Sequence, residues 1–220
     1  MGSILDAFFP PLCLNCRNPG RVRFGLCSRC LAQVEFTGLN ACIRCGRDCR
    51  GRHCAPAAHR YSRMLSLAGY RGPWRKVVQS AKFARERAVA VELARELARL
   101  AGEAGLALPR AVVPAPTASR HWRNFDIARL LAAELGRCFA VPVQPALARR
   151  PGRPPQVRLS RSQRLEGLED YIYVKNSRGL QDAVVWLVDD VYTTGATASA
   201  CAAALQAAGA RAVCVLVLAA

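Results

Sequence analysis

The chain has 220 residues, 52% of them hydrophobic, which is enough for one packed α/β domain and a small additional module. Its formal net charge is +17, and only Lys76, Lys82 and Lys175 are lysines, so 29 of the 32 basic residues are arginine. No apolar run approaches the roughly 20 residues of a membrane-spanning helix, and residues 1–12 carry no basic head, so we expect a cytoplasmic protein.

The arginine excess has two interpretations. Guanidinium groups pair well with phosphates and nucleic-acid backbones, and the segments 47–63 and 149–164 are the richest in them. A chain rich in arginine and alanine also results from a GC-rich genome, without any binding function. Charge alone therefore leaves contact with single-stranded DNA open.

Cysteine is concentrated near the N-terminus, where eight of the 11 cysteines lie before residue 55. Three C-x2-C pairs and one looser pair follow one another: Cys13 and Cys16, Cys27 and Cys30, Cys42 and Cys45, then Cys49 and Cys54. In a cytoplasmic chain, such pairs indicate metal binding rather than disulfides. The other three, Cys138, Cys201 and Cys214, stand in apolar surroundings and are expected to be small buried residues.

Two structural zinc ions would satisfy these eight thiolates. We assign the first ion to the cysteines at 13, 16, 27 and 30 and the second to those at 42, 45, 49 and 54, with His53 able to replace either member of the last pair. Interleaved pairing remains open from spacing alone. Four thiolates leave no open position, so a catalytic zinc is not expected. Binding free energies of about 10–16 kcal/mol per structural zinc would be the main source of order in this module.

After the cysteine module, apolar runs alternate with helical periodicity. The expected strands are Met64–Tyr70, Pro109–Thr117, a short edge strand at Val141–Leu147, its returning partner at Leu168–Val174, the run from Val184 to the acids at 189 and 190, and Ala210–Ala219. The expected helices are a region from about Trp74 to Leu100, broken near Phe83–Arg87, one from about Asn124 to Cys138, and one that contains residues 200–208 and ends at Gly209 as its C-cap. The Pro-rich segment 148–164 is expected to be a mobile loop.

This alternation predicts an α/β domain with a doubly wound, mostly parallel sheet and a ligand site at the carboxyl ends of its strands. The predicted boundary divides a cysteine-rich zinc-binding module at residues 1–60 from the α/β domain at residues 61–220.

The segment 184–197 reads VVWLVDDVYTTGAT and carries the most informative pattern in the chain. An uninterrupted apolar run that ends in Asp189 and Asp190 predicts a strand buried on both faces. The loop that follows contains Thr193, Thr194, Gly195, Ala196 and Thr197. Backbone N–H groups, hydroxyls and a helix N-terminus suit a phosphate, whereas paired carboxylates suit ribose hydroxyls or hydrated Mg²⁺.

Two other interpretations fit parts of this segment. The acids can be merely solvated at the end of an ordinary buried strand. The segment can also be the acidic strand of a nucleotide hydrolase, but that class needs the phosphate-binding sequence GxxxxGK[ST], and the chain contains no Gly-Lys pair.

The segment resembles the loop with which type I phosphoribosyltransferases hold phosphoribosyl pyrophosphate (PRPP), typically a hydrophobic strand, two acids and TTGxT. The resemblance implies that Asp189 and Asp190 hold the ribose hydroxyls, together with Mg²⁺, and that residues 193–197 hold the 5′-phosphate. A Pro-punctuated turn with Ala115, Pro116 and Thr117, followed by Arg120 and Arg123, suits the diphosphate end. Lys82 is a further candidate for binding PRPP; its simpler interpretation is a residue on a solvated helix face.

Nearly the entire chain resembles the ComF family of competence-associated, phosphoribosyltransferase-like proteins. The family's PPxCxxC is matched by PPLCLNC at residues 10–16, its CxxCG by residues 42–46, its YxG…LKF by Tyr70, Gly72 and residues 81–83, and its VPVP loop by VPAP at residues 113–116. The usual RGFNQA reads RNFDIA at residues 123–128, and Gly167 stands where asparagine is expected. The PRPP-binding half is thus intact, whereas the acceptor-facing half has changed.

This resemblance implies one of two functions. The first is a phosphoribosyltransferase that transfers ribose 5-phosphate from Mg²⁺-bound PRPP to an acceptor nitrogen. The second is a non-catalytic, PRPP-responsive module that binds single-stranded DNA or a protein. In either case the family association implies a part in DNA uptake during natural transformation, with DNA-uptake or replication-restart proteins as partners.

Overall fold

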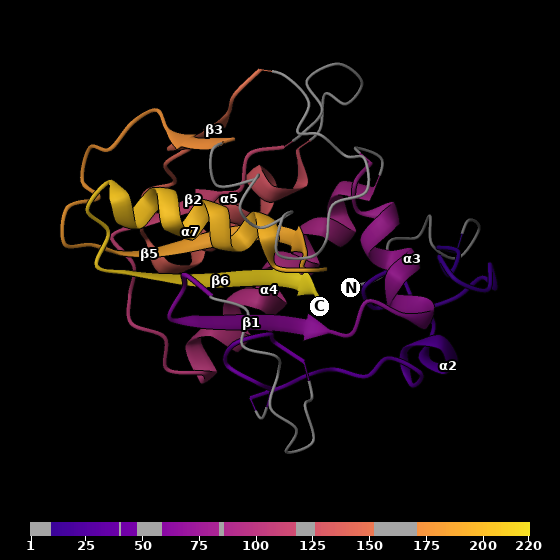
Figure 1. The fold of residues 1–220 in the computed structure, drawn as a ribbon. Coiled ribbons are helices and arrows are strands. Elements are labelled where there is room, and N and C mark those ends of the chain that lie inside the picture. Colours follow the sequence, from indigo (N-terminus) through magenta and orange to yellow (C-terminus); the bar gives the residue numbers. More distant parts are fainter. Residues whose placement is uncertain (1–9, 40, 48–58, 84–85, 118–125, 152–170) are drawn as a thin grey trace, which may run out of the picture.

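The computed structural model describes residues 10–39, 41–47, 59–83, 86–117, 126–151 and 171–220 (Figure 1). Its centre is a sheet of four parallel strands in the order β1–β6–β5–β2, which correspond to Arg63–Ala68, Ala212–Ala219, Val184–Val191 and Ala111–Pro114. The strands β5 and β6 pair along their whole length, from Val184 opposite Ala212 to Val191 opposite Ala219. Both strands are near-continuous apolar runs, as expected for parallel strands that are buried between two layers of helices.

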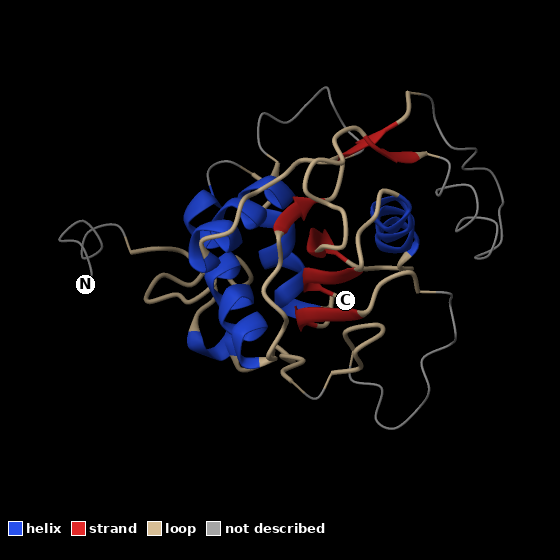
Figure 2. Ribbon diagram, turned by 90° about the vertical axis from the view of Figure 1, so that its left-hand side faces the viewer, coloured by secondary structure: helices blue, strands red, loops and turns tan. Residues whose placement is uncertain are grey.

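Helices cover both faces of the sheet. Figure 2 shows α3 (Gly72–Ser80), α4 (Arg87–Glu103) and α5 (Ile127–Phe139) on one face and α7 (Ala196–Ala207) on the other. The buried residues form two clusters, one centred on α4 and α5 and the other on α7. The arrangement confirms the predicted doubly wound, mostly parallel sheet. None of the helices in the described part of the chain combines the length and the apolar composition that crossing a bilayer requires.

Several helix boundaries follow directly from local chemistry. The expected helical region at residues 74–100 is divided into α3 and α4, with the break close to residues 83–87 as predicted. Helix α5 begins at Ile127 rather than near residue 124, because the Asp126 carboxylate accepts a hydrogen bond from the Arg129 N–H and caps the first turn. Helix α7 ends at Ala207, and Gly209, at φ 99°, lies beyond its C-cap rather than at it.

The small antiparallel sheet differs from the expectation for residues 141–147. Strand β3 is Leu147–Arg149, paired with β4 (Ile172–Val174), so the first residues of the expected loop at 148–164 belong to a strand. Val143 makes only an isolated bridge to Val112, because Pro142 and Pro145 cannot donate to a ladder. Most of the expected loop, and the start of the expected returning strand, lie outside the described residues.

The lone cysteines are only partly as expected. Cys201 and Cys214 are buried, but Cys138 is exposed. It lies in the last turn of α5, where the buried positions stop at Gly136 and both Arg137 and Cys138 face solvent.

The N-terminal module covers the free edge of β1. Phe36 forms an antiparallel bridge with Ala68, Thr37 N–H donates to the Leu67 carbonyl at 3.0 Å, and the Met64 N–H donates to the Ile43 carbonyl at 2.7 Å. These hydrogen bonds pair backbone groups that would otherwise be exposed at the edge of the sheet.

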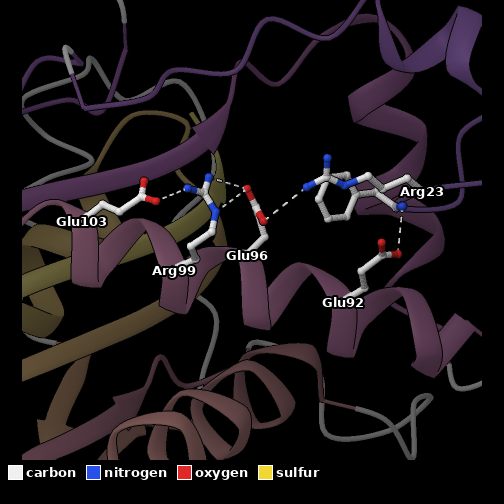
Figure 3. A network of polar contacts seen from close by, with 6 residues as sticks. Arg23, Glu92, Glu96, Arg99 and Glu103 are labelled. Carbon is white, nitrogen blue, oxygen red and sulfur yellow. Dashed lines mark hydrogen bonds and ion pairs between the residues drawn. The ribbon is translucent and has the colours of Figure 1, made fainter.

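The module is also fixed to α4 by polar contacts. The Phe24 N–H donates to the Glu92 carboxylate at 2.8 Å, and Glu96 pairs with both Arg23 and Arg99, as Figure 3 shows. Phe24 packs edge-on against Trp74 at a ring separation of 5.7 Å. The cysteine-rich segment is therefore built onto the α/β domain rather than tethered beside it.

Candidate functional site

The 193–197 loop joins the end of β5 to the start of α7. Gly195 has a φ of 81°, in the left-handed region that favours glycine, and a Cβ there would lie 2.2 Å from the Tyr192 hydroxyl. The loop therefore closes tightly over the Tyr192 ring, which is itself buried. Within it, the Ala196 N–H lies 3.4 Å from the Thr194 hydroxyl oxygen, and the Ser199 N–H donates to the Gly195 carbonyl at 2.8 Å.

A small hollow opens over this loop, lined by Asp189, residues 191–198 and Val217. The first amides of a helix have no intrahelical carbonyl partner, and threonines 193, 194 and 197 line the hollow at this helix N-terminus, so the junction can accept an anion. The five predicted phosphate-binding residues, Thr193 to Thr197, thus lie together at one strand–helix junction.

The two acids end the buried part of β5. The Asp190 N–H donates to the Asp189 carboxylate at 2.8 Å, and the Lys82 ammonium lies 2.5 Å from the Asp190 carboxylate. Lys82 stands in the turn after α3, so the structure brings it to the predicted acids across more than a hundred residues of sequence. Its simpler interpretation, a solvated helix face, does not describe this ion pair.

Burial and the neighbouring charge of Asp190 raise the pKa of Asp189 to about 7. A hydrogen bond from the Asp190 backbone and the positive charge of Arg149 act in the opposite direction. These two interactions do not outweigh burial and the charge of Asp190, so the ionised carboxylate needs further partners. Ribose hydroxyls or a hydrated cation would supply them, so the donor set fits both predicted partners.

The Pro-punctuated turn leaves β2 beside the acids. The Ala115 N–H donates to the Val188 carbonyl at 2.8 Å, one residue before Asp189. Ala115 is buried, Pro116 is partly buried and Thr117 is exposed. Arg120 and Arg123, the predicted cationic partners of this turn, lie outside the described residues.

Arg149, which the sequence interpretation did not select for this site, lies between the turn and the acids. Its Nε donates to the Pro116 carbonyl at 2.7 Å, and its charge lowers the pKa of Asp189. The guanidinium is thereby fixed beside the Pro-punctuated turn that was predicted to face a diphosphate. No local pattern distinguishes Arg149, because arginine is frequent throughout residues 149–164 and the contact joins residues 33 positions apart.

Four cysteine sulfurs form a compact cluster in the N-terminal module. The Sγ atoms of Cys13, Cys16, Cys27 and Cys30 all lie within 4.8 Å of one another, and those of Cys16 and Cys27 are 3.7 Å apart. A tetrahedral zinc with Zn–S bonds of about 2.3 Å places its sulfurs about 3.8 Å apart, so the spacing fits zinc. Backbone N–H groups favour the Cys13 thiolate against the opposing effect of burial and lower its pKa to about 6.

The two knuckles share one backbone design. In the first cysteine knuckle (residues 13–18) the Arg17 N–H donates to the Cys13 carbonyl and the Cys13 N–H to the Asn18 carbonyl. In the second cysteine knuckle (residues 42–47) the Gly46 N–H donates to the Cys42 carbonyl and the Cys42 N–H to the Arg47 carbonyl.

Even the left-handed residue recurs, at Arg17 with φ 63° and at Gly46 with φ 65°. The second knuckle is thus shaped like one whose sulfurs converge on a metal-sized space. Its partners Cys49 and Cys54 lie outside the described residues.

Known proteins are similar to this chain both in the N-terminal module and over most of its length. A family model described as a double zinc ribbon domain matches residues 4–59. The DNA utilization protein YhgH of Escherichia coli K12 is 30% identical over 217 residues, which cover 93% of this chain and 94% of the relative. Competence protein F of Haemophilus influenzae is 29% identical over 204 residues, which cover 86% and 88% of the two chains.

Two solved structures share a more distant likeness. The glutamine PRPP amidotransferase of B. subtilis, complexed with ADP and GMP, is 20% identical with a TM-score of 0.41 and covers 58% of this chain. A structure described as the allosteric regulatory enzyme of purine biosynthesis is 18% identical with a TM-score of 0.40 and covers 59%. This chain spans about a quarter of each, 25% and 26%. The zinc-ribbon match and the parallel sheet together confirm the predicted fold class.

Proposed function

The chain belongs to the family of competence protein F and the DNA utilization protein YhgH, and on that basis we propose that it binds Mg²⁺-bound PRPP at the carboxyl end of β5. One observation carries the proposal: Asp189 and Asp190 end a buried parallel strand and lead directly into a glycine-closed loop at the N-terminus of α7. Open α/β sheets bind their ligands at this edge. A 5-phosphorylated ribose needs both an anion cradle and hydroxyl acceptors, and this junction offers both.

Each part of the site has a role in this proposal. The 193–197 loop donates its amides and hydroxyls to the 5′-phosphate, and the two acids accept hydrogen bonds from the ribose hydroxyls. Arg149, anchored on Pro116, directs its guanidinium toward the diphosphate. Lys82 neutralises Asp190 in the free protein and is positioned to pair with a ligand phosphate once hydroxyls occupy that carboxylate.

Metal ions would serve the two modules differently. Bound with PRPP, Mg²⁺ would neutralise diphosphate charge, and the neighbouring acids would orient its hydration shell. Zinc in the cysteine cluster would be structural, since four thiolates complete its coordination. The family match to a double zinc ribbon supports a second zinc at residues 42–54.

Transfer of the ribosyl group is the enzymatic form of this proposal. Loss of pyrophosphate leaves positive charge on the ribose, and the carboxylates of Asp189 and Asp190 would stabilise it electrostatically. The experiment is a scan of nucleobases and amines for release of pyrophosphate from PRPP by the purified protein. Saturable binding without release for every acceptor would identify a PRPP sensor instead of a transferase.

A second candidate function is binding of single-stranded DNA, favoured by the net charge of +17 and by relatives named for DNA utilization and competence. Neutralisation of phosphates by arginine releases counterions, so the affinity for a labelled oligonucleotide should fall steeply between about 50 and 200 mM salt. Affinity that does not change with salt, or that is absent at low salt, would reject this candidate. An oligonucleotide affinity that changes on addition of PRPP would join the two functions in one module.

A further inference from the structure

The second cysteine knuckle touches the 193–197 loop directly. Arg47, the last residue of the knuckle, donates from Nη2 to the Thr193 carbonyl oxygen at 2.9 Å. The two residues are 146 positions apart in sequence, so this contact exists only because the N-terminal module folds onto the α/β domain. The guanidinium thus stands beside the loop that is proposed to hold the 5′-phosphate.

The position of Arg47 depends on the closed form of the knuckle. Its own carbonyl accepts the Cys42 N–H at 2.9 Å, the hydrogen bond that closes the turn. Gly46, at φ 65°, lies so close to the sheet that a Cβ would be 3.0 Å from the Met64 side chain and 3.1 Å from that of Ser66. Cys45 is buried in the same cluster as Tyr192. The knuckle is therefore packed against the sheet, and Arg47 extends from a fixed base.

A second path links the same two segments. The Tyr61 hydroxyl donates to the Arg44 carbonyl at 2.6 Å and is in hydrogen-bond contact with the Tyr192 hydroxyl at 3.0 Å. Tyr192 is the ring over which Gly195 closes. The knuckle is thus connected to the loop in two ways, directly through Arg47 and indirectly through the hydroxyls of Tyr61 and Tyr192.

We propose that the second cysteine knuckle contributes to the phosphate site: Arg47, through its hydrogen bond to the Thr193 carbonyl, positions the 193–197 loop for an anion and adds a positive charge beside the bound 5′-phosphate. This inference rests on the proposed PRPP function and extends it to the N-terminal module. Because Arg47 is held by the closed knuckle, ligand bound in the loop favours that closed form. By linkage, an intact knuckle strengthens ligand binding to the same degree.

The chain offers a matched control for the side chain. Arg44 belongs to the same knuckle and has the same charge and an exposed side chain, but it contributes only its carbonyl to the contacts described above. Calorimetric titrations of wild type, Arg47→Ala and Arg44→Ala with Mg-PRPP and with ribose 5-phosphate compare the two positions. Arg47→Ala should weaken both ligands by roughly three- to tenfold, between the effects of an exposed ion pair and a charge-assisted hydrogen bond. Arg44→Ala should remain within twofold of wild type.

The outcomes are separable. Absence of PRPP binding by wild type would overturn the proposed function and this inference with it. Binding by wild type with equal affinity for Arg47→Ala would overturn the inference alone. A loss confined to PRPP, with ribose 5-phosphate unaffected, would place Arg47 at the diphosphate and contradict its assignment to the 193–197 loop.

A separate experiment measures the coupling between ligand binding and the closed form of the second knuckle. Alkylation of Cys42 by iodoacetamide, followed by peptide mass spectrometry, reports opening of the second knuckle, and Cys16 in the first knuckle is the internal control. Saturating Mg-PRPP should slow alkylation of Cys42 by the same three- to tenfold factor and leave Cys16 unchanged. Equal rates with and without PRPP at both cysteines would overturn the coupling.

Discussion

The acid pair should give the proposed PRPP binding a characteristic dependence on pH. Asp189 has a pKa of about 7, raised by burial and by the charge of Asp190 from an ordinary value of 3.8. The proposed role requires the ionised carboxylate, so binding must release a proton wherever Asp189 is still protonated. With this pKa, about one tenth of the groups are ionised at pH 6 and about nine tenths at pH 8. The affinity should therefore rise roughly tenfold across that interval.

The assay is calorimetric titration with Mg-PRPP at pH 6, 7 and 8 for wild type, Asp189→Asn and Asp182→Asn. Asp182 is a suitable control because its side chain is 80% exposed and pairs with Arg211 at the surface. The phosphates of the ligand titrate identically in all three experiments, so differences between profiles isolate the protein group.

Asparagine keeps the shape of the side chain but removes its charge. Hydrogen bonds to charged groups contribute about 1.5–3 kcal/mol, so Asp189→Asn should bind roughly ten- to hundredfold more weakly at pH 8 and lose its part of the pH dependence. The same raised pKa lowers the stability of wild type as pH rises from about 4 to 7, because the unfolded state ionises first, and Asp189→Asn should lack that loss in thermal melts. Parallel binding profiles for wild type and Asp189→Asn would refute the assignment.

Three further predictions concern other parts of the molecule. Purified protein should contain about two zinc ions by elemental analysis, and Cys13→Ser should lose soluble protein because metal binding supplies folding energy; a well-folded, metal-free sample would contradict this. Gly195→Ala should destabilise the protein by about 1–3 kcal/mol in denaturant titrations and weaken PRPP binding, because φ 81° and the Tyr192 hydroxyl both disfavour a side chain. Gly102→Ala, in open space on α4, should instead be neutral or stabilising, and equal effects at the two glycines would count against the tight loop. Arg149→Ala should weaken PRPP binding about tenfold in calorimetry, whereas Arg150→Ala, whose guanidinium lies over the Tyr173 ring, should not; equal losses would indicate a general charge effect.

The sequence was most informative where one local pattern sufficed. Buried strands such as β5 and β6 are near-continuous apolar runs, which the sequence shows directly. The acids and the small residues of segment 189–197 are adjacent in sequence, so their proximity could be predicted without knowledge of the fold. The prediction at residues 141–147 was wrong because apolar content suggested a strand, whereas the two prolines there limit pairing and the ladder begins at Leu147.

Long-range contacts were beyond local patterns. The packing of the helices, strands and loops determines three contacts of the site: Lys82 with Asp190, Arg149 with Pro116, and Arg47 with Thr193. Lys82 was already a candidate from the sequence, but among 32 basic residues nothing local distinguished Arg149 or Arg47 for this site. The left-handed residue after each C-x2-C pair of the two knuckles was not predicted either, because it is Gly46 in one knuckle and Arg17 in the other.

Calorimetric titration of wild type and Asp190→Asn with Mg-PRPP, with circular dichroism to verify that both are folded, decides whether the acids of β5 hold the ribose. If the end of β5 holds the ribose, wild type should bind saturably and Asp190→Asn should retain the fold but bind roughly ten- to hundredfold more weakly. Equal affinities, or no binding by folded wild type, would mean that the two acids are merely solvated at the end of a buried strand.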